Sequence, residues 1–118
     1  MITKPTLESV LAKYFKMRDD RDWLQFHNPK NLAISLSLEA AEVLEYFQWS
    51  DLEESTRIGK EEQADIADEL ADVASYLFAL ADVLGIDLIE AMDTKIDKTM
   101  QKYPIEKAKG NNTKYTKL

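Results

Sequence analysis

The sequence predicts an all-α protein, a four-helix bundle, because three features of the chain agree. Apolar residues recur every three or four positions over long stretches, which is the period of one helix face. Helix-start and helix-stop residues bracket these stretches. No run alternates β-branched and polar residues in the way that strands do. At 118 residues, the chain has the length of one domain, which we expect to span residues 1–118.

The first helix is expected over residues 6–18 and the second over residues 29–49. Thr6 can cap the first helix, and Asn28 followed by proline is the signal of a capped start for the second. An aromatic loop, residues 23–29, separates them. The apolar row of the second helix consists of Leu32, Leu36, Ala40, Val43 and Phe47.

The third helix, expected over residues 60–84, has the most regular apolar period in the chain. Residues 50–54 predict a short helical turn before it, and Gly59 predicts a break. A second apolar row makes this helix apolar on two sides, so we expect it to be central. Its main row consists of Ile66, Leu70, Val73, Leu77, Leu80 and Leu84.

The fourth helix is expected to end at about Tyr103, and a basic tail follows it. Gly85 ends the third helix, and Asp87 with Glu90 three residues later resembles a capping box that opens the fourth. Residues 104–118 contain four lysines and one glutamate, a net charge of +3. Because the whole chain carries −7, residues 1–103 carry −10.

The charge and the distribution of apolar residues exclude several classes of partner. A net charge of −7 argues against broad nucleic-acid binding, because phosphate backbones attract basic surfaces. Lys4, Glu8 and Lys13 interrupt the N-terminal segment where a signal peptide needs an apolar run. The longest apolar run, residues 73–81, is too short to span a bilayer. With no cysteine, the composition fits a reducing compartment, so we expect a cytoplasmic protein with no membrane partner.

Two acidic rows indicate the chemistry. Glu39 and Glu42 are followed by a tyrosine at position 46, and thirty residues later Glu69 and Asp72 are followed by a tyrosine at position 76. On helices, these spacings place each row on one face, at the edge of the apolar row. Two such rows facing each other would gather four carboxylates around one point, a site for Mg²⁺, which Mn²⁺ can replace. Taken singly, each acid is typical of a helix surface, and the paired pattern favours a site.

The segments around these rows resemble those of a known family. The pattern Glu-x-x-Glu, 26 residues, then Glu-x-x-Asp is similar to the signature of the MazG-like nucleoside triphosphate pyrophosphohydrolases, and in particular to their dCTP pyrophosphatase branch. Di-iron carboxylate bundles are excluded, because they need Glu-x-x-His on two helices and the one histidine, His27, is in a loop. The flanking matches are Arg21-Asp22-Trp23, Phe26-His27, Pro29-Lys30-Asn31-Leu32, Phe47-Gln48-Trp49, Lys102-Tyr103-Pro104 and Lys114-Tyr115.

The resemblance implies an enzyme that hydrolyses a nucleoside triphosphate to the monophosphate and pyrophosphate. The expected substrate is dCTP or a related pyrimidine deoxynucleotide, the role is housekeeping of the nucleotide pool, and the assembly is a homodimer or homotetramer. Mg²⁺ would hold the triphosphate while water attacks the α-phosphorus. The implied metal ligands are Glu39, Glu42, Glu69 and Asp72, with Glu39 and Glu42 also as catalytic residues. The implied substrate-binding residues are Trp23, His27, Trp49, Tyr76 and Lys95.

Several alternatives stay open. Thr99 stands where relatives commonly have asparagine, which puts phosphate positioning there in doubt. Glu45 continues the first acidic row and could act as general base, although its outward position favours an ordinary surface acid. The substrate could instead be dUTP or a nucleotide with a modified base. Outside enzymes, the chain could be a non-catalytic helical module that oligomerises through its apolar faces.

Overall fold

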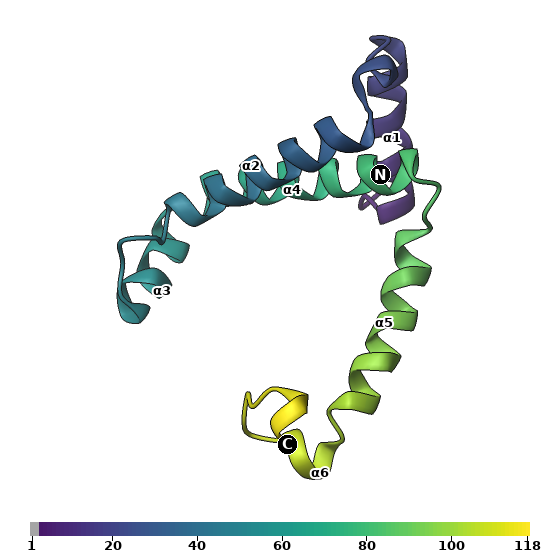
Figure 1. Ribbon diagram of the computed structural model, residues 1–118. Coiled ribbons are helices and arrows are strands. Elements are labelled where there is room, and N and C mark those ends of the chain that lie inside the picture. Colours follow the sequence, from purple (N-terminus) through teal and green to yellow (C-terminus); the bar gives the residue numbers. More distant parts are fainter. Residues whose placement is uncertain (1–2) are drawn as a thin grey trace. The chain divides into compact units, whose positions relative to one another are not determined.

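The computed structural model describes residues 3–118, and the first two residues of the expected domain lie outside this range. This part of the chain contains helices and no strand, which confirms the all-α prediction (Figure 1). It has six α-helices, so the expected count of four is not confirmed. The α-helices are α1 (Leu7–Asp20), α2 (Pro29–Glu45), α3 (Leu52–Glu61), α4 (Gln63–Val83), α5 (Leu88–Lys102) and α6 (Ile105–Ala108), and the 3₁₀ turns are η1 (Leu24–Phe26) and η2 (Tyr115–Lys117).

Side-chain caps fix the starts of four helices. Thr6 accepts a hydrogen bond from the backbone N–H of Ser9 at 3.1 Å and opens α1. Asn28 accepts from the N–H of Asn31 at 2.9 Å, with proline in the first turn of α2. Asp51 and Asp87 make the same bond at the starts of α3 and α5. These caps satisfy backbone donors that a helix start leaves without partners.

Helix α3 is the main departure from the expected elements. Ten residues form a helix where a short turn over residues 50–54 was expected, and the helix continues through Gly59. A glycine inside a helix costs only about 1 kcal/mol relative to alanine, so a good cap can outweigh it. The break falls instead at Glu62, which leaves the helical conformation at φ −104° and ψ 21°. As a result, α4 begins at Gln63 rather than at residue 60.

The chain divides into two compact units after Gly85, whose φ of +68° is the left-handed conformation that glycine adopts freely. The second unit, Ile86–Leu118, contains α5, α6 and η2. Within it, the rings of Tyr103 and Tyr115 meet edge to face at 5.9 Å, and Lys102 Nζ lies 4.7 Å from the centre of the Tyr115 ring. None of the helices in residues 3–118 is long and apolar enough to cross a membrane.

In the first unit, α2 and α4 lie side by side and run in opposite directions (Figure 1). Leu32 on α2 and Ala79 on α4 are buried, and Ala79 is completely inaccessible to solvent. Ala79 belongs to the flank of α4 that carries Glu69, Asp72 and Tyr76, and this flank faces α2, since carboxylate oxygens of Glu69 and Asp72 lie within 4.8 Å of one of Glu39.

The main apolar row of α4 is only partly core. Ile66 is buried as expected, but Leu70 keeps 52% of its surface exposed, and Leu77 and Leu84 are also exposed. The single chain therefore buries only part of the main apolar row of the helix that we expected to be central. The sequence period identifies an apolar face but does not specify whether the same chain covers it.

Candidate active site

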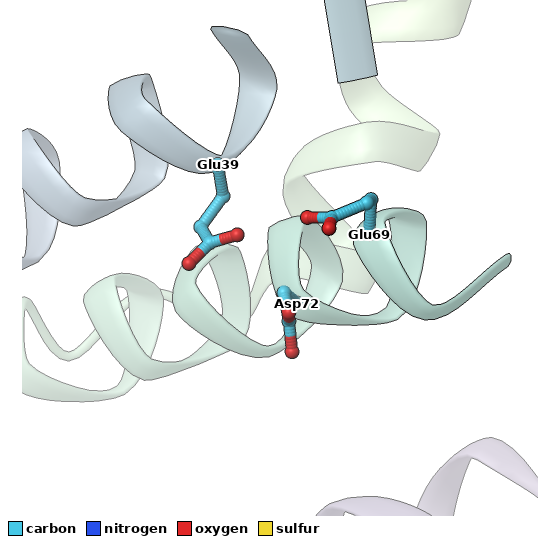
Figure 2. A group of neighbouring side chains, drawn as sticks. All are labelled: Glu39, Glu69 and Asp72. Atoms are coloured by element: carbon cyan, nitrogen blue, oxygen red, sulfur yellow. The ribbon is translucent and has the colours of Figure 1, made fainter. Parts of the chain in front are cut away.

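Three of the four expected metal ligands converge between α2 and α4. Glu39 lies on α2, and Glu69 and Asp72 lie one turn apart on α4. A carboxylate oxygen of each lies within 4.8 Å of an oxygen of the other two. In Figure 2, Glu39 extends from its helix toward α4, and the carboxylate of Glu69 points toward Glu39. The antiparallel packing of two helices with Glu/Asp at i and i+3 produces this convergence.

Two oxygens of this cluster lack the partners that buried polar atoms normally have. Glu39 and Glu69 are half-buried, and Oε2 of each is buried without a hydrogen-bond partner among the described residues. A buried carboxylate oxygen without a donor is costly. A divalent cation would supply the missing partner to both oxygens at once. The donor set is entirely carboxylate oxygen, which suits a hard cation such as Mg²⁺.

Crowding of these acids changes their proton affinity. A hydrogen bond with Glu42, burial and the charges of Glu42, Glu39 and Asp72 raise the pKa of Glu69 to about 7. A hydrogen bond with Glu42 and burial also raise the pKa of Glu39, and a hydrogen bond with Glu69 partly offsets this. Glu42 is thus next to both residues, although it lies outside the group of three. Like charges at this separation favour a shared proton or a bound cation.

A cavity of about 460 Å³ adjoins the cluster, lined by Glu42, Glu45, Tyr46 and Glu69. Glu45 is exposed, as its outward position predicted, and still lines this cavity. Burial, followed by the charges of Asp65 and Glu69, raises the pKa of the Tyr46 phenol. The cavity wall is therefore acidic and would attract a cation.

A second pocket, of about 250 Å³, has an aromatic wall. Its expected members are Trp23, His27 and Tyr76. The other lining residues are Phe26, Asn31, Leu32 and Ser35, of which Ser35 carried no role in the sequence prediction. The η1 turn supplies Phe26, and the first turns of α2 supply the others.

The aromatic pocket and the acidic cluster lie on one continuous face. On α2, Asn31, Ser35 and Glu39 are spaced by four residues, so each lies one turn from the next. On α4, Tyr76 and Asp72 have the same spacing. Both helices therefore lead from an aromatic pocket to a carboxylate cluster about 6 Å, one turn, further along. This register was a sequence signal that could have identified Ser35.

The surroundings of His27 favour the neutral form of its imidazole. Burial and the positive charge of Arg18 lower the pKa of its imidazole, while Asp19 and Asp82 oppose the shift. Its Nδ1 is buried and has no partner among the described residues. A neutral imidazole has one nitrogen that donates and one that accepts, so His27 can offer a specific polar contact beside the aromatic side chains of the pocket.

Two of the expected substrate-binding residues are not brought to this pocket within the first unit. Trp49 follows the C-terminal end of α2 and is 90% exposed. Residues 36–45 of α2, which follow the pocket residue Ser35, separate it from the pocket by roughly 15 Å along the helix. Lys95 is on α5 in the second unit, where it lines a surface depression with Thr94 and Lys98. Thr99 donates its hydroxyl to the carbonyl of Lys95 at 3.0 Å, so this donor is already used within the helix.

Comparisons with known proteins agree on one family for this chain. The MazG-like family model matches residues 34–118. The dCTP pyrophosphatase 1 of Rattus norvegicus is 40% identical over 117 residues, which cover 98% of this chain and 69% of the rat protein. The human dCTP pyrophosphatase 1 is 38% identical with the same coverage.

A solved structure is also similar. A pyrophosphatase from Archaeoglobus fulgidus superposes with a TM-score of 0.80 at 40% identity, covering 88% of this chain and 99% of that one. The resemblance noted in the sequence is thereby confirmed, and the reading as a non-catalytic helical module is set aside. The chain belongs to the MazG-like family and is a nucleoside triphosphate pyrophosphohydrolase.

Proposed function

We propose that this protein hydrolyses a pyrimidine deoxynucleoside triphosphate, with dCTP favoured, to the monophosphate and pyrophosphate in a Mg²⁺-dependent reaction. The observation that carries the proposal is the continuous face that joins an aromatic pocket to a carboxylate cluster. A nucleotide has the complementary division, an aromatic base at one end and an anionic phosphate chain at the other. The names of the mammalian relatives support dCTP as the substrate.

Glu39, Glu42, Glu69 and Asp72 are the residues that would hold Mg²⁺. Bound there, the cation would neutralise the negative charge of the phosphates and lower the pKa of a coordinated water. The four acids must be ionised to act as ligands, so Glu39 and Glu69 must lose the protons that crowding otherwise favours. Among these four acids, Glu39 and Glu42 are the proposed catalytic residues. The general base is unassigned, and Glu45 is a candidate because it lines the cavity beside Glu42.

The aromatic pocket would hold the base. Trp23 and Tyr76 offer flat faces for stacking, which is worth about 1–3 kcal/mol per base but discriminates poorly between bases. Discrimination needs directional polar groups, and His27, Asn31 and Ser35 of the pocket supply them. With the base in the pocket, the phosphates would extend along α2 and α4 toward the acids.

We further propose that the working enzyme is a homodimer or homotetramer. The row of Leu70, Leu77 and Leu84 is apolar and exposed, which is typical of a surface that another subunit covers. Trp49 is also an exposed apolar side chain of the kind that another subunit covers. Its surface is 90% exposed, although tryptophan is usually well buried. In an assembly, Trp49 and Lys95 could complete a site whose other residues are already on one face of the first unit.

The experiment that tests this function is a substrate panel. Purified protein with Mg²⁺ is incubated with each ribo- and deoxynucleoside triphosphate, and pyrophosphate and orthophosphate are measured separately. We expect pyrophosphate and monophosphate from dCTP, with loss of activity in EDTA and recovery with Mg²⁺ or Mn²⁺. Preference for dUTP or for a modified base would correct the substrate and keep the reaction. Orthophosphate as the first product, or no turnover of any nucleotide, would contradict the proposal.

A further inference from the structure

Arg18 is the one buried charged side chain in the described part of the chain, with 6% of its surface exposed. It lies near the end of α1 and outside the acidic cluster. Burying a guanidinium is costly unless its donors are paired. Arg18 Nε donates to Asp19 at 2.9 Å, and Nη1 donates to Asp82 at 2.8 Å. The guanidinium also lies over the ring of Phe15, 4.6 Å from its centre.

The bond from Arg18 to Asp82 joins distant parts of the first unit. It connects two side chains that are 64 positions apart in the sequence. Asp82 is near the end of α4, six residues after Tyr76 of the aromatic pocket. The bond therefore ties the end of α1 to the helix that carries one wall of that pocket.

The backbone of Arg18 holds the turn that leads to Trp23, another lining residue of the pocket. Its carbonyl accepts hydrogen bonds from the N–H of Arg21 at 3.3 Å and of Trp23 at 3.0 Å, so the turn that ends α1 closes on Arg18. Asp22 within this turn has a φ of +54°, a conformation that is strained for a residue other than glycine. The side chain of Gln25 donates to Asp22 at 3.0 Å and fixes the turn further.

We infer that Arg18 is a positioning residue of the aromatic pocket: its side chain anchors α1 to α4 while its carbonyl fixes the turn that presents Trp23. Through these two connections, Trp23 and His27 are held at a defined distance from Tyr76. The closeness of Arg18 to His27 agrees with this arrangement, because the charge of Arg18 contributes, after burial, to lowering the pKa of that imidazole. No group of Arg18 needs to touch the substrate.

The test separates positioning from general stability. Replacing a buried ion pair by an apolar side chain of similar size is often neutral for stability, and both acidic partners of Arg18 are about half exposed. For Arg18→Met, we therefore expect little change in the melting temperature and an unchanged response of that temperature to Mg²⁺. The kinetic part of the test rests on the proposed function. KM for dCTP should rise about tenfold while kcat stays within about twofold, because a displaced pocket residue weakens substrate binding and leaves the reacting groups in place.

A second readout does not depend on activity. In a Trp49→Phe background, Trp23 is the one tryptophan, and Arg18→Met should make its fluorescence more accessible to acrylamide. This measurement keeps its meaning even if no nucleotide is turned over. Asp82→Asn should raise KM and the acrylamide quenching of Trp23, but by less than Arg18→Met does. The double variant should show the same KM and quenching as Arg18→Met alone.

The matched control is Arg57→Met, which removes an exposed ion pair with Glu61 on α3 and should leave KM, kcat and quenching unchanged. If Arg18→Met fails to fold, Arg18→Lys and Asp82→Asn carry the same test. An unchanged KM together with unchanged Trp23 quenching would overturn the inference. So would a parallel loss of kcat, Mg²⁺ response and melting temperature, because that pattern describes a residue needed only for folding.

Discussion

Replacing Glu69 by glutamine should change how the stability of the metal-free protein depends on pH. The ordinary pKa of this carboxyl is 4.5, and its neighbours raise it to about 7 in the folded protein. The folded state therefore binds the proton more tightly than the unfolded state. The stabilisation is complete below pH 4.5 and is lost as the pH rises through about 7. The melting temperature of the metal-free wild type should therefore decrease as the pH rises from 5 to 8.

The same pKa sets the expected effect on Mg²⁺ binding. With a pKa of about 7, the ionised fraction of Glu69 is about nine-tenths at pH 8 and about one-tenth at pH 6. Because the cation needs the ionised form, the apparent affinity for Mg²⁺ should fall about tenfold as the pH decreases from 8 to 6. Saturating Mg²⁺ should remove most of the pH dependence of the melting temperature, since it replaces the proton.

Melting curves with and without Mg²⁺, recorded from pH 5 to pH 8, measure both effects. Glu69→Gln should lose the metal-free pH dependence, melt above wild type at pH 8 and respond weakly to Mg²⁺. Glu8→Gln, which replaces an exposed acid on α1, should behave as wild type. The refuting result would be a melting temperature of the metal-free wild type that rises, relative to that of Glu69→Gln, as the pH increases from 5 to 8. That result would mean that the neighbouring acids do not raise the pKa of Glu69.

Three further changes test other parts of the account. Asp72→Asn should lower kcat by about 100-fold or more through loss of a ligand to the Mg²⁺ that would hold the phosphates, measured as pyrophosphate release, while the helical circular dichroism is retained. Trp23→Ala should raise KM for dCTP roughly 5- to 100-fold through lost stacking, with kcat little changed in steady-state kinetics. Leu77→Glu should break the exposed apolar row of α4 and shift light scattering toward the monomer, and an unchanged mass would refute that interface.

The parts of the fold that depend on local bonds could be predicted from the sequence. Thr6, Asn28 and Asp87 cap helices through hydrogen bonds that reach only three residues ahead, so the residue types are sufficient. The sequence does not predict the full length of helix α3, because Gly59 suggests a break, although one glycine costs little free energy compared with the stability of a capped helix. Helix α2 ends at Glu45, four residues before the expected end at residue 49. The chain continues there as a turn that contains no proline or glycine, so the sequence gives no signal for it.

The acidic cluster could be predicted for a similar reason. Spacings of three residues place Glu39 with Glu42, and Glu69 with Asp72, on single faces, and two matching faces need only an antiparallel pairing to converge. The position of Trp49 could not be predicted, because spacing along one helix does not reveal what lies beyond its end. The same limit applies to Leu70, whose apolar character gives no information on whether its own chain or another covers it.

The most direct measurement of the central claim locates the attacked phosphorus. The enzyme hydrolyses dCTP with Mg²⁺ in ¹⁸O-labelled water, and mass spectrometry then determines which product carries the label. Our account places the base in the aromatic pocket and the phosphates on the acidic cluster, with attack at the α-phosphorus, so the label should appear in dCMP and not in pyrophosphate. Label in pyrophosphate, or in released orthophosphate, would contradict it.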